Sequence, residues 1–178
     1  MATDNFNRAD SGNLGANWTN GSNGMQILTN RAVAAVDVAF NTAFYSGVAF
    51  SGNHSSEALV NHGGVSRMGL TVRQTGADCY YIDIKIDSSA TELWKLVSSS
   101  FTQIGGNLGA PTNAHTYKLD ASGTTLKVYD NGAQMSTDQS DAALSGGAPG
   151  IMSITTLEAL DDWVGSDGAP RRFILGTH

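Results

Sequence analysis

The sequence predicts an all-β protein, built as an antiparallel two-sheet β-sandwich. Many short segments alternate apolar and polar residues, and turns containing glycine or asparagine separate them at a spacing typical of sandwiches. The clearest alternation covers residues 79–87, and the clearest turn is Asn131-Gly132. With 178 residues, the chain has the size of one such domain.

The first 64 residues predict short strands joined by polar loops. Residues 25–28 form a short strand candidate. Residues 32–45 contain alanines, which favour helix, but their β-branched and aromatic residues favour strand, and we predict strand. Residues 48–50 predict another strand, whereas residues 52–64 are rich in His, Asn and Ser and predict a loop.

Two segments in the middle of the chain, residues 66–73 and 79–87, alternate strictly. Because strand side chains point to opposite faces in turn, each segment has one face toward the core and one away from it. The set expected in the core is Met68, Leu70, Val72, Tyr80, Ile82, Ile84 and Ile86. The set expected on the outer face is Arg67, Thr71, Arg73, Tyr81, Asp83, Lys85 and Asp87.

The next segments continue the all-β pattern. Residues 92–97 predict the returning strand, with Trp94 and Leu96 facing inward. Residues 101–113 predict a long loop that contains glycine, and residues 115–120 predict a further strand.

Asn131-Gly132 predicts a β-hairpin with a two-residue type I′ turn, because both central positions of that turn need positive φ. The turn also fixes the register of the two strands. The expected partners are Asp130 with Ala133, Tyr129 with Gln134, Val128 with Met135, and Leu126 with Thr137.

Composition argues against two kinds of partner. The net charge is −6 and the basic residues are scattered, which argues against nucleic acid because phosphate binding needs a basic patch. No apolar run approaches the roughly 20 residues of a membrane helix.

Cys79 is the only cysteine, so an intrachain disulfide is excluded and the fold must depend on packing, with or without a metal ion.

The last fourteen residues differ from the rest, and we therefore place the sandwich at residues 1–164 and a C-terminal arm at residues 165–178. Residues 165–170 predict a flexible joint. A basic and apolar segment follows, made of Arg171, Arg172, Phe173, Ile174 and Leu175. Two interpretations stay open: an edge strand on its own domain, or an arm that pairs with a neighbouring subunit and makes these five residues subunit contacts.

Several motifs, taken in their order along the chain, resemble the concanavalin A-like, laminin G-like jelly-roll superfamily. They are residues 4–8 with 14–18, residues 126–132, residues 146–151, and Leu160-Asp161-Asp162-Trp163. The resemblance spans most of the chain and implies two antiparallel sheets, one of them concave, with ligand on the concave face or at a loop edge. Members include lectins, glycan-binding modules, polysaccharide hydrolases and lyases, and virion surface proteins, and fold does not choose among these.

The resemblance also implies a structural calcium site. Many relatives tie the N-terminal strand to the last strand with Ca²⁺, held by an Asp side chain and backbone carbonyls. Asp161 matches that position and Asp4 is its expected neighbour. Carboxylate and carbonyl oxygens suit a hard cation. The alternative is that Asp161 and Asp162 are simply exposed at the start of a strand.

A glycan site on the concave sheet is a further expectation from the resemblance. If the sheet curves as in relatives, five residues share its concave side: Arg67, Arg73, Tyr81, Asp83 and Lys85. Aromatic rings stack on sugar faces and charged groups bind hydroxyls, although any exposed β-face has a similar composition. Trp18, Trp94 and Trp163 lie beside apolar strand residues, so we expect them in the core.

Catalytic signatures are weak. Sandwich glycosidases of this superfamily carry Glu-x-Asp-x-x-Glu on one strand, and the sequence lacks that motif. Asp83 and Asp87 are the nearest pair and are expected to be solvated. The histidines His54, His62 and His115 lack metal-ligand spacing.

Three functions therefore remain, the first being a non-enzymatic virion surface protein, such as a phage capsid decoration or tail-associated subunit. Residues 1–4 lack the start of a secretory signal, which suits either a removed signal or release by lysis. This hypothesis places the protein on a virion as a homo-oligomer or beside other virion subunits. The alternatives are an extracellular carbohydrate-binding module or lectin, and a polysaccharide-cleaving enzyme. The roles of virion surface protein and of glycan-binding module are compatible with each other.

Overall fold

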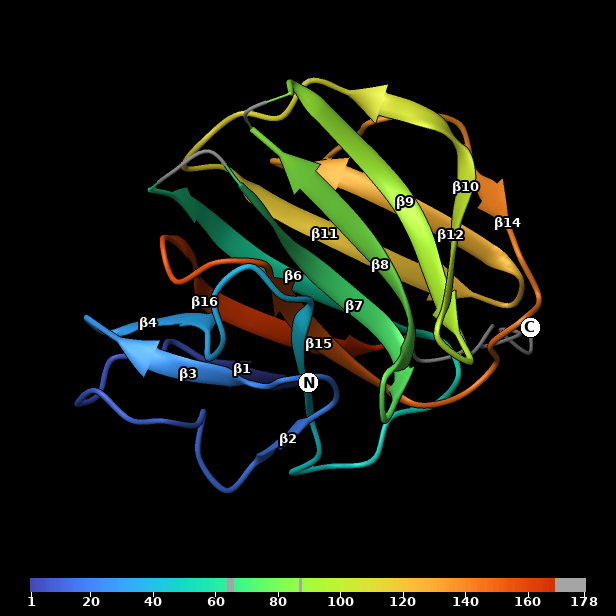
Figure 1. The fold of residues 1–178 in the computed structure, drawn as a ribbon. Coiled ribbons are helices and arrows are strands. Elements are labelled where there is room, and N and C mark those ends of the chain that lie inside the picture. The colour runs from blue at the N-terminus through green and yellow to red at the C-terminus, as the bar shows by residue number, and fades with distance from the viewer. Residues whose placement is uncertain (64–65, 87, 169–178) are drawn as a thin grey trace, which may run out of the picture.

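The computed structural model describes residues 1–63, 66–86 and 88–168, and all regular secondary structure in them is β-strand. Two antiparallel sheets stack face to face, as Figure 1 shows, which confirms the predicted β-sandwich. Within these residues no helix is long and apolar enough to cross a membrane.

In the described part of the chain, one sheet has nine strands and the other has seven. The nine-stranded sheet has the order β13 (Ala133–Gln134), β12 (Thr125–Asp130), β11 (Thr116–Ser122), β6 (His54–His62), β16 (Glu158–Asp167), β4 (Arg31–Ala34) and β3 (Met25–Leu28), with β1 (Ala2–Asp4) on β16 and β14 (Gln139–Ser140) on β12. The seven-stranded sheet has the order β10 (Ser100–Gly109), β9 (Ala90–Val97), β8 (Asp78–Lys85), β7 (Arg67–Thr75), β15 (Ala148–Ser153), β5 (Asn41–Tyr45) and β2 (Trp18–Asn20).

The core lies between the two sheets and confirms the predicted alternation on β7 and β8. Its members from these strands are Met68, Leu70, Val72, Tyr80, Ile82 and Ile84, all buried. One polar link crosses the core: the Trp163 indole donates to Ser56 Oγ at 2.9 Å, and Ser56 Oγ donates to the Gly150 carbonyl at 2.6 Å. Because β6 and β16 belong to one sheet and β15 to the other, this link joins the layers.

The predicted hairpin forms with the expected turn. Asn131 and Gly132 have φ of 45° and 80°, and Tyr129 and Asp130 face their predicted partners. The register changes further along, because Leu126 pairs with Gln139 of β14 rather than with Thr137. The returning strand is thus interrupted between β13 and β14, which a turn motif alone does not specify.

Four sequence-based assignments of secondary structure were wrong. The predicted loop at residues 52–64 contains β6, and the loop at 101–113 contains β10. Residues 48–50 form no strand, and the predicted strand at 32–45 is divided into β4 and β5. The glycines near the middle of β10 coincide with register shifts between Ile104 and Asn107, so here they mark bulges rather than a loop.

The last described strand passes the predicted domain boundary. β16 continues beyond residue 164 to Asp167, and Gly165 pairs with Ala2 of β1. The expected joint therefore begins inside a strand. The predicted contact residues of the arm, Arg171, Arg172, Phe173, Ile174 and Leu175, lie outside the described residues.

Candidate functional site

A pocket of about 260 Å³ opens on the outer face of the seven-stranded sheet. Its lining consists of Phe40, Arg67, Tyr81, Asp83, Trp94, Phe101, Met152 and Ile154. The strand residues among them alternate with core residues, so their side chains point away from the sandwich interior. Several belong to a second apolar cluster, which is separate from the main core.

Aromatic rings form one side of this pocket. The Phe40 ring lies 5.0 Å from the Tyr81 ring and 5.3 Å from the Phe101 ring, measured between centroids. Phe40 precedes β5, and Phe101 lies on β10, five positions away in the sheet, which is about 24 Å across a flat sheet at about 4.8 Å per strand. The sheet must therefore curl for the two rings to be in contact, and a hollow is enclosed between the curled sheet and the segment before β5.

A network of paired charges adjoins these rings. Asp83 is fully buried and accepts two hydrogen bonds from Arg67, from Nε at 3.1 Å and from Nη2. Lys85 Nζ lies 3.9 Å from Asp83 and 2.5 Å from Glu92. The Trp94 indole donates to the same Glu92 oxygen at 2.8 Å. Trp94 is thus held by a hydrogen bond at its edge, and the charged groups are oriented before any ligand arrives.

Both carboxylates of this network are engaged by donors of the protein itself. Asp83 and Glu92 face each other across β8 and β9. Burial raises the pKa of Asp83, although Arg67 opposes this effect, and the side chain has no exposed surface with which to reach a substrate. Burial also acts to raise the pKa of Glu92, but hydrogen bonds from Lys85 and Trp94 outweigh it and lower that pKa. Both carboxylates act as anchors for donors.

Four of the five residues expected to bind ligand come together, and one does not. Arg67, Tyr81 and Asp83 line the pocket, and Lys85 joins its charge network. Arg73 lies elsewhere: it is buried, and its guanidinium donates to the Gly52, Leu144 and Gly123 carbonyls.

The register explains the different position of Arg73. β7 has a register shift between Val72 and Thr75, and Arg73 itself has a φ of 52°. This left-handed backbone conformation interrupts the alternation of side chains, which had predicted Arg73 on the same face of the strand as Arg67. The expectation that both arginines share one face is therefore wrong.

Three aromatic residues of the pocket were missed by the sequence analysis. Trp94 was expected in the core, but it is half-buried and lines the pocket, while its neighbour Leu93 is in the core. Leu96 likewise belongs to the outer cluster. Phe40 and Phe101 had been placed in a strand and a loop, without a role. Apolar residues occur at both odd and even positions of β9, so alternation alone does not show which face of this strand points into the core. The other two tryptophans, Trp18 and Trp163, are buried in the core as expected.

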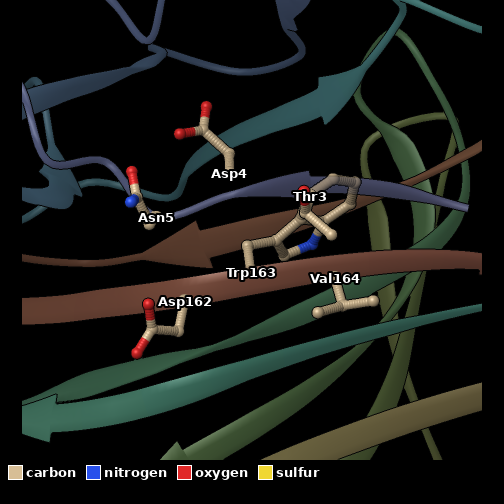
Figure 2. A pocket seen from close by; sticks show the side chains of 6 residues that line it. All are labelled: Thr3, Asp4, Asn5, Asp162, Trp163 and Val164. Carbon is tan, nitrogen blue, oxygen red and sulfur yellow. The ribbon is translucent and has the colours of Figure 1, made fainter.

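The predicted calcium ligands lie at the seam between β1 and β16, where Asp4 pairs with Trp163. The seam has its own pocket of about 400 Å³, and in Figure 2 the carboxylates of Asp4 and Asp162 point away from each other there. Asp161 accepts a hydrogen bond from the Asp162 amide at 2.9 Å, and burial raises its pKa.

These residues do not fit a calcium ion. Asp4 already accepts four hydrogen bonds, two of them from the Arg8 guanidinium. Ca²⁺ needs six to eight oxygen ligands. Within the described part of the chain, no three acidic, histidine or cysteine side chains gather as a metal site.

The other candidate groups do not form a site together. His54 is buried, and its ring bonds the Ser51 carbonyl and the Arg73 amide. His115 Nδ1 lies 2.6 Å from Asp130. Asp87, the proposed partner of Asp83, lies outside the described residues.

Comparison with solved structures places the fold. The chain is similar to the carbohydrate-binding module CBM66 from Bacillus subtilis, with a TM-score of 0.72 and 14% identity over 85% of this chain and 96% of that one. It is also similar to the galectin LEC-6 from Caenorhabditis elegans, with a TM-score of 0.53 and 15% identity over 66% of this chain and 85% of that one. The apo form of Crh5 transglycosylase has a TM-score of 0.59 and 12% identity, over 95% of this chain and 84% of that one.

No protein-family profile matches the sequence, and no curated protein matches it. At these identities, the structural likeness shows the fold alone. The described chain is an antiparallel two-sheet β-sandwich, and its fold is similar to that of the carbohydrate-binding module and the galectin.

Proposed function

We propose that this protein is a non-enzymatic carbohydrate-binding module or lectin, and that its sugar site is the pocket on the seven-stranded sheet. The observation that carries the proposal is the junction of partly exposed aromatic rings with an oriented guanidinium in one hollow. Sugar rings have apolar faces and a rim of hydroxyls, so they suit a pocket with an apolar lining and a few fixed polar groups.

Arg67 is the expected hydroxyl-binding group of the site. Asp83 accepts hydrogen bonds from its Nε and from one N–H of Nη2, and Nη1 donates to none of the described residues. The Arg67 side chain is 40% exposed and lines the pocket, while Asp83 has no exposure, so the remaining N–H groups of the guanidinium are the ones we expect to meet a ligand. Two parallel donors among these match two neighbouring oxygens of a ligand.

The volume of the pocket suits a small part of a glycan. About 260 Å³ lies just below the usual range of about 300–1,000 Å³ for small-molecule pockets. A sugar ring stacked between Trp94 and Phe101 is therefore the expected bound group. The structures similar in fold include a carbohydrate-binding module by name, which supports this role over that of a virion subunit.

A glycan array followed by affinity electrophoresis in soluble polysaccharides tests the proposal. Trp94→Ala should weaken binding at least about 25-fold, because losing a central aromatic anchor costs about 2 kcal/mol or more. Tyr129→Ala is the matched control: this half-buried ring lies on β12 of the other sheet, beside Lys118. Equal losses in both variants, or no glycan bound by the unaltered protein, would contradict the proposal.

Display of this site on a virion surface stays a prediction, since none of the similar structures named above is a virion protein by its name. The test is the oligomeric state before and after deletion of residues 169–178. The deletion must begin after Gly168, because residues up to Asp167 belong to β16. Loss of assembly in this variant would support the subunit-contact role of the arm.

A further inference from the structure

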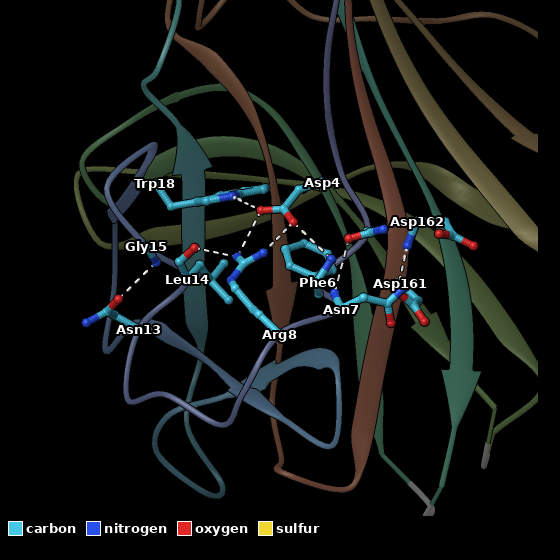
Figure 3. Close-up of polar contacts among 11 residues, drawn as sticks. Asp4, Phe6, Asn7, Arg8, Asn13, Leu14, Gly15, Trp18, Asp161 and Asp162 are labelled. Atoms are coloured by element: carbon cyan, nitrogen blue, oxygen red, sulfur yellow. Dashed lines mark hydrogen bonds and ion pairs between the residues drawn. The ribbon is translucent and has the colours of Figure 1, made fainter.

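The carboxylate of Asp4, at the end of β1, has all its hydrogen-bonding positions occupied by protein groups (Figure 3). Oδ1 accepts from the Phe6 amide at 2.9 Å and from Arg8 Nη1 at 2.7 Å. Oδ2 accepts from Arg8 Nη2 at 2.9 Å and from the Trp18 indole at 2.8 Å. Two donors on each oxygen leave no free direction from which a metal ion could bind.

Arg8 is itself fixed in place. Besides its two bonds to Asp4, Nη2 donates to the Leu14 carbonyl at 2.6 Å, and the guanidinium lies 5.6 Å from the centre of the Phe6 ring. The Asp4 side chain is 13% exposed, so the bidentate pair is partly shielded from water. The pair of Arg8 and Asp4 thereby ties β1 to the segment around Leu14, through Arg8, and to the core residue Trp18, through Asp4.

The position of this cluster in the fold indicates what it does. Asp4 faces Trp163 across the seam between β1 and β16, where the resemblance to jelly-roll proteins implied a calcium ion. A structural cation at such a seam neutralises a carboxylate and joins the first strand to neighbouring segments. Arg8 does both with one permanent charge, and its fork matches the geometry of a carboxylate. A second cation at Asp4 would be repelled by that charge.

We propose that the Arg8 guanidinium is a built-in replacement for a structural metal, and that the protein folds without calcium. Its N-terminal strand is held by Arg8, Asp4 and Trp18 instead of by an ion. This inference goes beyond the proposed sugar site and does not depend on it.

The first test uses the unaltered protein and the metal alone. Thermal unfolding is followed in EDTA and then in about 5 mM CaCl₂, and the midpoint should be the same in both. A site with a Kd of about 50 µM would instead raise the midpoint by about 5–11 °C, since the ligand stands at about 100 times its Kd. A calcium-dependent rise of this size would overturn the proposal.

The second test removes the guanidinium. Arg8→Met keeps the alkyl stem and should lower the midpoint by about 5 °C or more, because the buried side of Asp4 loses two charge-assisted bonds. Arg8→Lys keeps the positive charge but not the forked pair of donors, so its unfolding midpoint should lie between those of the unaltered protein and Arg8→Met. This variant keeps the test decisive if Arg8→Met does not fold. Lys127→Met, which breaks an exposed ion pair with Asp138, is the control and should leave the midpoint unchanged. An Arg8→Met protein as stable as the control would overturn the proposal.

Discussion

Replacing Asp83 by asparagine removes the charge that orients Arg67 in the pocket, and the structure gives the size of the effect. Breaking a buried ion pair costs about 3–5 kcal/mol. The Arg67 side chain is 40% exposed and turns to water when its partner is lost, so we reduce the cost for Asp83→Asn to about 2–3 kcal/mol. Arg67→Met is more severe, at about 3–5 kcal/mol, because it leaves a carboxylate with no exposed surface whose one remaining cationic partner among the described residues, Lys85, lies 3.9 Å away.

Urea and thermal unfolding of both variants and of the double variant measure these costs. Asp83→Asn should lower the midpoint by about 4–12 °C, at about 2–4 °C per kcal/mol. The double variant should be more stable than Arg67→Met alone, since it no longer buries an unpaired charge. The exposed pair of Lys127 and Asp138 is the control and should show no measurable coupling. Equal costs for the two single variants, with additive behaviour in the double variant, would refute the reasoning.

Three further predictions concern the rest of the fold. Ser56→Ala leaves the buried Trp163 indole without its acceptor and should cost about 1–3 kcal/mol in urea unfolding, whereas Ser56→Thr keeps the hydroxyl and should cost less. Burial lowers the pKa of His54, whose neutral ring accepts a hydrogen bond from the Arg73 amide. The free energy of unfolding should therefore be at its full value above pH 6.5 and fall as the pH drops below it. A His54→Gln protein should show a flatter profile of stability between pH 7 and pH 5. Burial raises the pKa of the Cys79 thiol, so this group should be inert to Ellman's reagent in the folded protein and react after denaturation; reaction at equal rates in both states would contradict its position.

The sequence predicts the fold well wherever one local rule acts alone. The strict alternation on residues 79–85 predicts the correct inner and outer faces, and Asn131-Gly132 predicts the correct turn. β6 was missed because its serines and asparagine suggest a loop, yet it is a central strand between β11 and β16. Its Ser56 is satisfied by bonds to both sheets, which only the tertiary structure supplies.

The candidate site was predicted in part, for a physical reason. Arg67, Tyr81 and Asp83 follow from strand periodicity on neighbouring segments. Phe40 precedes β5 and Phe101 lies on β10, five positions away in the sheet, so their contact depends on the curl of the whole layer. Such contacts between distant strands leave no periodic signal in a single sequence.

The direct test of the sugar site is a nuclear magnetic resonance titration of the three tryptophan indole N–H signals with a glycan that the array identifies. The Trp94 indole lies at the pocket, whereas those of Trp18 and Trp163 are bonded to Asp4 and Ser56 at the core. We expect the Trp94 signal to shift in proportion to the bound fraction, and the other two to stay within their linewidths. Shifts confined to Trp18 and Trp163, or to amides around Tyr129 on the other sheet, would contradict the account.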